Sequence, residues 1–281
     1  MDRVALVIAN RLVNNRDASA ALEITLVGPE LLFEHHAVLA IAGADLSPAV
    51  DGRSIPLWTA LAISAGSRLT FGPRQTGARS YLAVAGGFDV PLLWGSRSTH
   101  LPTGTGGLNG RALAADDILR VFAAGTRGPT IGAALPVNSR PPYASTPVLR
   151  IMAGPQEPSA DALSTLVSSP YRLKSESNRM GFRLEGQRLE NGSMAPAISD
   201  GTAMGALQIP PDGQPILLMA DRPTTGGYPK AAVVIAADIP LAAQLLPGDA
   251  LLFRHTTLRE AEAAFADQWG RIDGALPPRE A

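Results

Sequence analysis

Hydrophobic and polar residues alternate in short runs along the first half of the chain, after one segment with helical spacing. Apolar positions in residues 2–13 recur with the period of an amphipathic helix, which we expect there. The runs that follow are short enough for strands and are separated by turn residues; they cover 22–26, 31–33, 37–41, 58–63, 68–71 and 79–84. Asp51-Gly52, between 47–50 and 53–56, is typical of a two-residue hairpin turn.

A long segment without periodicity separates these strands from the second half. Residues 88–111 are rich in glycine and polar side chains, and a loop of this length inside a domain is usually functional when it is ordered. The run 118–122 predicts one more strand. Residues 123–146 contain Gly, Pro, Ser and Asn and show little apolar order, so we interpret them as a linker between two domains.

The second half repeats the pattern of short strands with two helices. We expect helices at 159–167 and 258–269, the second of them introduced by a capping box from Thr257 to Glu260. Residues 198–208 predict a loop. The expected strands are 148–152, 171–173, 216–219, 231–235 and 250–253.

Composition supports a mainly β protein and excludes several classes of function. The 28 glycines and 24 prolines favour many turns, and 46% hydrophobic residues suffice for a sizeable core. A net charge of -1 gives no reason to expect nucleic acid or a membrane surface as a partner. Without cysteine, membrane-length apolar runs or a signal-peptide pattern, the chain is expected to be cytoplasmic.

The stretch 208–230, QIPPDGQPILLMADRPTTGGYPK, has the densest chemistry in the chain. Two apolar runs flank a loop that carries an acid, a guanidinium, hydroxyls, a phenol and an ammonium, and they suggest a hairpin. Lys230 is easy to single out because the chain has only one other lysine, Lys174. The alternative, in which these polar residues only cap a turn, stays open on the residues alone.

Other loops carry cations that could meet this one. Arg179 and Arg183 share one segment with Asn178, and Arg97 lies in the long loop. Guanidinium groups match planar oxyanions, so a shared rim would suit a carboxylate, carboxyphosphate or ureido ligand, with Asp221 and Glu157 as counter-charges. For each arginine taken singly, a solvated surface position is the better interpretation. The hypothesis of a shared site rests on several loops carrying the same feature.

Metal and serine-hydrolase chemistry are not expected. Of the four histidines only His35 and His36 are close in sequence, and neighbours on a strand point to opposite faces. No G-x-S-x-G motif occurs, and Thr99-His100 is the only hydroxyl–histidine neighbour of note. Gly104–Gly107 lacks the Lys-Ser/Thr of a phosphate-binding P-loop.

Several long motifs resemble one known family. RSYLAVAGGFDVPLLWGSRSTH…GTGGLNGRAL (79–113), GPQE (154–157), SNRMGFRLEG (177–186) and the stretch 208–230 are similar to allophanate hydrolase subunit 2 and the C-type subunit of 5-oxoprolinase, also described as a biotin-dependent carboxyltransferase family. The resemblance implies two tandem cyclophilin-like antiparallel β-barrel domains with a few short helices. We assign residues 1–135 to the first and 136–281 to the second.

The resemblance implies three alternative functions. The first is a subunit of an ATP-dependent 5-oxoprolinase complex that cleaves 5-oxo-L-proline, an amide, to L-glutamate together with companion A- and B-type subunits. ATP could be bound by another subunit. The second is a carboxyltransferase that moves a carboxyl group from carboxybiotin, carried by a partner protein, to urea or a urea-like amide. The third is a non-catalytic regulator that binds a kinase-inhibitor partner.

Under the first hypothesis the motifs supply the site. Asp221, Lys230 and Arg179 are the expected catalytic residues. Arg183 and Arg222 would hold substrate oxygens, and the backbone from Thr225 to Gly227 would donate to a developing oxyanion. The expected substrate-binding residues are Arg183, Arg222, Thr225, Gly226, Gly227, Tyr228, Gln208, Asn178, Gln156 and Arg97.

The beginning of the sequence departs from the family's pattern. Members of the family usually carry a further segment with a strand and a Gln-Asp-x-Gly-Arg-type motif ahead of the helix that we expect at 2–13. We therefore expect the first barrel to be incomplete at its N-terminal edge, which would leave an unpaired strand.

Overall fold

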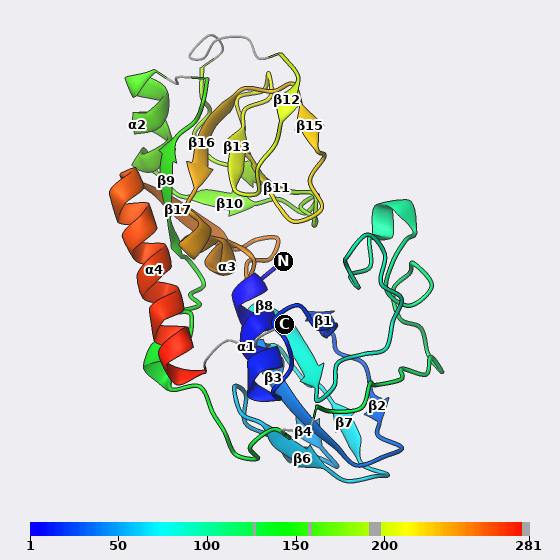
Figure 1. Ribbon diagram of the computed structural model, residues 1–281. Coiled ribbons are helices and arrows are strands. Elements are labelled where there is room, and N and C mark those ends of the chain that lie inside the picture. Colours follow the sequence, from blue (N-terminus) through cyan, green and yellow to red (C-terminus); the bar gives the residue numbers. More distant parts are fainter. Residues whose placement is uncertain (126–127, 157–158, 191–197, 277–281) are drawn as a thin grey trace. The chain divides into compact units, whose positions relative to one another are not determined.

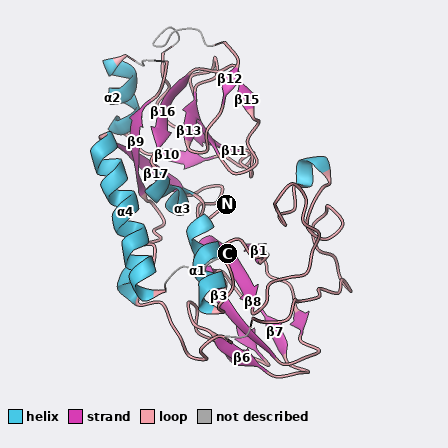
Figure 2. Cartoon of the chain, in the orientation of Figure 1, coloured by secondary structure: helices cyan, strands magenta, loops and turns pink. Residues whose placement is uncertain are grey.

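The computed structural model describes the chain except residues 126–127, 157–158, 191–197 and 277–281 (Figure 1). Contacts within the chain divide it into two units. The barrel unit contains Met1–Asp2 and Pro141–Gly270, and the sheet unit contains Arg3–Arg140 and Arg271–Ala281. The expectation of a mainly β protein with a few helices is confirmed (Figure 2).

The sheet unit is built around a four-stranded antiparallel sheet in the order β1-β8-β3-β6. Helix α1 (Arg3–Leu12), at the expected place, packs on β3 and β8. Alternation along the strands turns Ile24, Leu39 and Leu82 into the core. The strands are β1 (Leu22–Thr25), β3 (Ala37–Asp45), β6 (Leu61–Ile63) and β8 (Thr76–Val84).

A second four-stranded sheet, β2-β7-β4-β5, completes this unit. The hairpin predicted at Asp51-Gly52 is present, since β4 pairs with β5 on either side of these two residues. Asp51 and Gly52 both have positive φ, as this turn type requires. The strands are β2 (Leu31–Leu32), β4 (Ala49–Val50), β5 (Arg53–Ser54) and β7 (Arg68–Thr70).

The long loop is irregular, as expected, but ordered by its own contacts. The loop contains a short 3-10 helix, η1 (Leu101–Thr103). A second one, η2 (Val137–Ser139), lies in the segment interpreted as a linker. The strand predicted at 118–122 is wrong: Val121 makes only an isolated bridge with Phe88. The apolar run is real, but it pairs at one position only and leaves the Ile118 side chain exposed.

The barrel unit contains a closed barrel in the order β10-β11-β14-β13-β16-β9-β17. Its interior is filled by alternate residues such as Leu149, Tyr171, Phe182 and Leu217, all of them buried. The expectation of a purely antiparallel barrel is wrong at one seam, because β17 runs parallel to β9. The strands are β9 (Val148–Ala153), β10 (Tyr171–Leu173), β11 (Gly181–Glu185), β13 (Ala206–Gln208), β14 (Ile216–Leu218), β16 (Lys230–Val234) and β17 (Ala250–His255).

Two helices pack on the barrel close to the positions expected at 159–167 and 258–269. Ser159 caps α2 (Ala160–Ser168) by accepting a hydrogen bond from the Ala162 N–H. The capping box is confirmed, since Glu260 accepts from the Thr257 N–H at 2.8 Å and donates its own N–H to Thr257 Oγ1. The helix it starts, α4 (Leu258–Ala275), is longer than expected. A short segment that the pattern did not reveal forms η3 (Ala236–Asp238) and α3 (Ile239–Ala242).

Two expectations about the segment before Lys230 are wrong. Residues 198–208 are not only a loop, since they contain β12 (Asp200–Gly201) and β13. The two apolar runs 216–219 and 231–235 do not form a hairpin either, because β13 lies between β14 and β16 and pairs with both. β12 pairs instead with β15 (Thr225–Gly226), inside the supposed hairpin loop.

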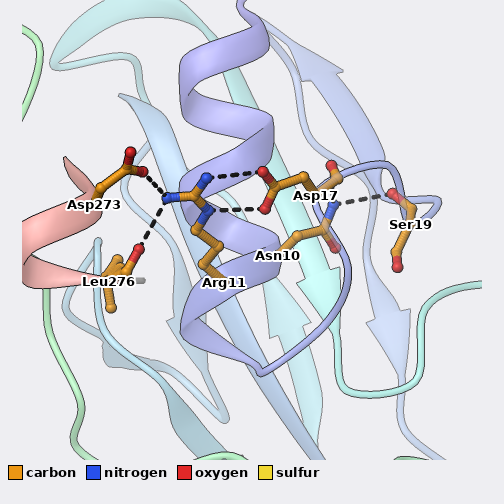
Figure 3. A network of polar contacts seen from close by, with 6 residues as sticks. All are labelled: Asn10, Arg11, Asp17, Ser19, Asp273 and Leu276. Atoms are coloured by element: carbon orange, nitrogen blue, oxygen red, sulfur yellow. Dashed lines mark hydrogen bonds and ion pairs between the residues drawn. The ribbon is translucent and has the colours of Figure 1, made fainter. Parts of the chain in front are cut away.

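A buried arginine ties the C-terminal residues of the sheet unit to α1 (Figure 3). Arg11 donates to both carboxylate oxygens of Asp17 at 2.8 Å. Its Nη1 atom donates to Asp273 at 2.6 Å and to the Leu276 carbonyl at 2.9 Å. These contacts raise the pKa of Arg11, mainly through the hydrogen bond to Asp17. One guanidinium therefore satisfies two carboxylates and a backbone carbonyl.

Replacement of this arginine should destabilise the sheet unit. The Arg11 side chain is 4% exposed, whereas Asp17 and Asp273 are 35% and 44% exposed. We expect Arg11→Ala to lower the free energy of unfolding by roughly 2–3 kcal/mol, less than for a fully buried pair because both carboxylates still reach water. Urea denaturation measures the change. Arg16→Ala, an exposed neighbour, is the control, and an equal loss in both variants would contradict the assignment.

Candidate functional site

One row of side chains crosses the outer wall of the barrel. Because side chains alternate along a strand, Leu207 and Leu217 point into the core while their neighbours Gln208 and Ile216 face outward. Gln208 pairs with Ile216 on one side and, across a register shift, with Lys230 on the other. The amide of Gln208 and the ammonium of Lys230 therefore belong to adjacent strands.

The β12–β15 ribbon covers this part of the wall. Asp200 pairs with Gly226, and Gly201 pairs with Thr225. Gly226 lies so close to the Gln208 amide that a Cβ at this position would overlap Nε2. The glycine is needed here for the close approach of the ribbon to the barrel.

Two further contacts close the base of the ribbon. The Thr202 N–H donates to the Thr224 carbonyl at 3.0 Å. Arg222 donates from Nε to the Thr202 carbonyl at 3.3 Å. Arg222, expected to hold substrate, is thus placed where it braces the ribbon.

Lys230 is held from three directions. Its side chain is only 4% exposed, and Nζ lies 3.5 Å from Oδ2 of Asp200, a carboxylate that is 66% exposed. Its backbone N–H donates to Oε1 of Gln156 at 2.9 Å. Gly154, in the same turn as Gln156, packs directly against the Lys230 carbonyl, where a Cβ would not fit. A buried ammonium whose ion pair is this long keeps donor capacity for a ligand.

Gln208 carries the unexplained group of the site. Its Nε2 atom is buried and has no hydrogen-bond partner among the residues that the structure describes. A buried donor without a partner costs about 1–3 kcal/mol, so native proteins rarely keep one without a reason. Together with the Lys230 ammonium and the Asp200 carboxylate, this donor suits a ligand with an amide or ureido group, whose oxygen accepts and whose nitrogen donates.

Arg179 and Asp221, both expected to be catalytic, form a pair with each other. Arg179 donates to the two Asp221 oxygens at 2.8 and 3.1 Å, and the Asp221 N–H donates to the Arg179 carbonyl at 2.9 Å. Asn178 accepts from the Met180 N–H at 2.8 Å. These contacts join the end of β14 to the turn before β11, so they position the start of the loop that follows β14.

The remaining candidates lie elsewhere. Arg183 and Tyr228 line a shallow pocket on the barrel wall. Thr225 is exposed on the ribbon, and Gly227 packs near Ser199. Arg97 belongs to the sheet unit, where it donates to the Val90 carbonyl and lies 4.9 Å above the Phe122 ring. Glu157 lies outside the described residues.

Two residues of interest were missed by the sequence reasoning. Asp200 was hidden because its segment has no periodicity and was interpreted as a loop. Lys174 lines the same pocket as Arg183. The scarcity of lysine could have drawn attention to Lys174, since Lys174 and Lys230 are the only two lysines in the chain.

Within the described residues, no group of three or more histidine, aspartate or glutamate side chains is placed to hold a metal ion. The described helices include none with the length and apolar character needed to cross a membrane.

The protein is mainly β and contains a closed barrel. The β12–β15 ribbon covers the polar side chains of Gln208 and Lys230 on the outer wall of this barrel. The chain belongs to the family of the carboxyltransferase domain, subdomain A and B, whose model matches residues 1–255. The family resemblance inferred from the motifs is thereby confirmed.

Relatives of this chain come from two groups of proteins. It is 40% identical over 272 residues to the C-type subunit of the 5-oxoprolinase of Escherichia coli (strain K12), covering 95% of this chain and 85% of that protein. It is 33% identical to a putative urea carboxylase of Emericella nidulans, covering 92% of this chain and 22% of that protein.

Two solved structures share the fold of this chain. The urea amidolyase of K. lactis matches with a TM-score of 0.90 at 28% identity, over 98% of this chain and 18% of that one. A protein designated TTHA0988 matches with a TM-score of 0.80 at 34% identity, over 90% of this chain and 48% of that one. The chain therefore spans only part of these longer proteins.

The close approach of Gly226 can be tested with its neighbour as the control. Gly226→Ala places a methyl group against the end of the Gln208 side chain, which has to move aside, so we expect a loss of about 1 kcal/mol in the free energy of unfolding. Gly201→Ala, in the paired strand of the same ribbon, meets open space and should change it by less than about 0.5 kcal/mol. Thermal or urea unfolding measures the free energy of unfolding of both variants. Equal losses in Gly226→Ala and Gly201→Ala would argue against the contact between Gly226 and Gln208.

Proposed function

We propose that this chain is a subunit of an ATP-dependent 5-oxoprolinase-type complex that cleaves 5-oxo-L-proline to L-glutamate together with companion A- and B-type subunits. The 40% identity to the C-type subunit of a 5-oxoprolinase over 95% of the chain supports this proposal. A second such subunit, from Haemophilus influenzae, is 34% identical. In this proposal the complex uses ATP, and a companion subunit binds it.

The partnerless donor of Gln208 is the observation that carries the proposal. In the cleavage of a cyclic amide, water adds to the carbonyl carbon, the C–N bond breaks, and the ring nitrogen takes up a proton. Negative charge develops on the carbonyl oxygen as water adds. Gln208 Nε2 and Lys230 Nζ are buried donors that would stabilise this charge, because the β12–β15 ribbon shields both donors from bulk solvent.

The other polar groups take supporting roles in this proposal. Asp200, more exposed than Gln208 and Lys230, accepts from Lys230 and would accept from the amide N–H of the substrate. Gln156 holds the backbone of Lys230. Arg179 and Asp221 act as positioning residues, because their paired side chains join the loop to the barrel.

A second candidate function is carboxyl transfer from carboxybiotin on a partner protein to urea or a urea-like amide. The TM-score of 0.90 with a urea amidolyase and the 33% identity to a putative urea carboxylase favour it. The same donors would then polarise the carbonyl of the urea, and Asp200 would accept from its N–H groups. The donor set is common to both reactions, so the partner and the product distinguish them.

Reconstitution with the companion subunits tests the principal proposal. With 5-oxoproline and ATP, the complex should produce glutamate. Lys230→Ala and Gln208→Ala should each lower kcat by about a hundredfold or more, since each removes one donor from the developing oxyanion. Arg188→Gln, an exposed cation on the same unit, should retain activity. Wild-type activity in both site variants would overturn the assignment of the site.

Avidin separates the two enzymatic functions. If a biotinylated partner delivers the carboxyl group, avidin should abolish turnover, because it sequesters the biotin. We expect glutamate production to be insensitive to avidin. Avidin-sensitive consumption of urea and no glutamate would favour the second function. A stable complex without any turnover, unaffected by Lys230→Ala, would instead indicate a binding regulator.

A further inference from the structure

A shallow pocket on the outer wall of the barrel lies beside the candidate site. Lys174 and Arg183 supply its positive charge, and Tyr228 and Gln214 supply further polar side chains. Leu184, Pro210, Pro215 and Ile216 form its apolar part, and Asp212 completes the lining. The proposed reaction uses none of these charged groups.

The two cations are direct neighbours across two strands. The last ladder pair of β10 and β11 is Leu173 with Leu184, and just beyond it the Lys174 N–H donates to the Arg183 carbonyl at 2.9 Å. Both side chains line the same pocket. Directly opposite side chains in an antiparallel pair lie on the same face, about 5 Å apart at Cβ. Like charges in this arrangement repel and destabilise the sheet.

No carboxylate is in direct ionic contact with this pair among the residues that the structure describes. Neither Lys174 nor Arg183 forms a salt bridge there. Several other arginines of the chain do have carboxylate partners, as Arg111, Arg150 and Arg179 show. Lys174 and Arg183 therefore keep their donor groups free of a salt bridge, although Glu176 interacts with both cations at longer range.

The acids nearby are engaged with other groups. Asp212 accepts a hydrogen bond from the Gln214 N–H at 3.1 Å. Glu176 accepts from Ser175 at 3.1 Å. The pKa of Glu176 is lowered first by a backbone hydrogen bond and by Ser175, and only then by the charges of Lys174 and Arg183. The Gln214 side chain bonds both polar groups of the Gly186 backbone.

We propose that this pocket binds an oxyanion, a phosphate or a carboxylate group of a small ligand, between Lys174 and Arg183. The planar fork of Arg183 matches two oxygens of such a group, and the ammonium of Lys174 adds a point charge from the neighbouring strand. The bound anion removes the cross-strand repulsion. Tyr228 at the rim is the available hydroxyl donor.

The pocket and the candidate site share one row of the barrel wall. Register pairs Arg183 with Ile216, Ile216 with Gln208, and Gln208 with Lys230. Strands are spaced by about 4.8 Å, so Arg183 lies roughly 10 Å from Gln208 along the row. Tyr228 also precedes Lys230 by two residues. The oxyanion subsite is therefore separate from the donors at Gln208, and its existence does not rest on the reaction proposed there.

Anion binding to the purified full chain tests the inference. We would titrate the protein at low ionic strength with inorganic phosphate and, separately, with glutarate as a carboxylate probe, by calorimetry and thermal unfolding. At least one probe should bind with millimolar or better affinity and raise Tm, because a ligand of the native state stabilises it. Binding should weaken as salt is added, because the pocket is open to solvent.

Charge-removing variants locate the site. Lys174→Gln and Arg183→Gln should each weaken binding about tenfold or more, since each removes one charge-assisted contact. Without anion, each variant should unfold at the same Tm as the wild type or a higher one, because the repulsion is relieved. Arg188→Gln removes an equal charge from an exposed position of the same unit and should bind the probe as the wild type does.

The outcomes separate the sources of the oxyanion. Phosphate binding alone would indicate a phosphate-bearing ligand, and glutarate binding alone would indicate a carboxylate substrate or product. Both results support the subsite. The inference is overturned if neither probe binds, or if Arg188→Gln loses as much affinity as the two pocket variants, which would show unspecific attraction. Lys230→Ala should retain anion binding even if it abolishes turnover, so failure of the subsite and failure of the proposed function are distinguishable.

Discussion

The placement of β13 between β14 and β16 is the constraint on which the candidate site depends. Because Gln208 pairs with Ile216 on one side and with Lys230 on the other, the chain between β14 and β16 cannot turn back directly. It has to cross the outer face of β13, where β15 pairs with β12 to form the β12–β15 ribbon. The loop that carries Asp221 to Tyr228 therefore becomes the cover of the barrel wall.

That cover explains why polar groups are buried on the outer face of a barrel. The outward side of such a strand would ordinarily be solvated, and an amide or ammonium there would cost nothing to keep. Under the ribbon, Gln208 and Lys230 lose water, while Asp200, the carboxylate that pairs with Lys230, sits at the exposed edge. The same desolvation makes both donors more effective toward a carbonyl oxygen. Gly226 permits this arrangement, because it adds no side chain between the ribbon and the amide.

Much of the fold could be predicted from local signals, and the failures share one physical cause. The capping box at Thr257 and the Asp51-Gly52 turn are correct, because each depends on residues a few positions apart. The hairpin predicted around Asp221 is absent. Its two apolar runs do form strands, as predicted, but β13 pairs with both of them, and local sequence signals do not reveal such a long-range pairing. Three-residue strands such as Ala206–Gln208 are too short to show a period.

The site was predictable as a set of residue types rather than as an arrangement. Arg179 and Asp221 were singled out as expected catalytic residues, and in the structure they form an ion pair with each other. Isolated cations on loops cannot be sorted into paired and unpaired groups without the register that places their neighbours. Register is also what makes Lys174 informative: alone it is an ordinary surface lysine, and opposite Arg183 it is half of a repulsive pair. Among the residues that the structure describes, the barrel wall keeps a buried amide donor without a partner and two neighbouring cations without a salt bridge. Each arrangement costs stability, and a ligand that contacts these groups would recover part of it.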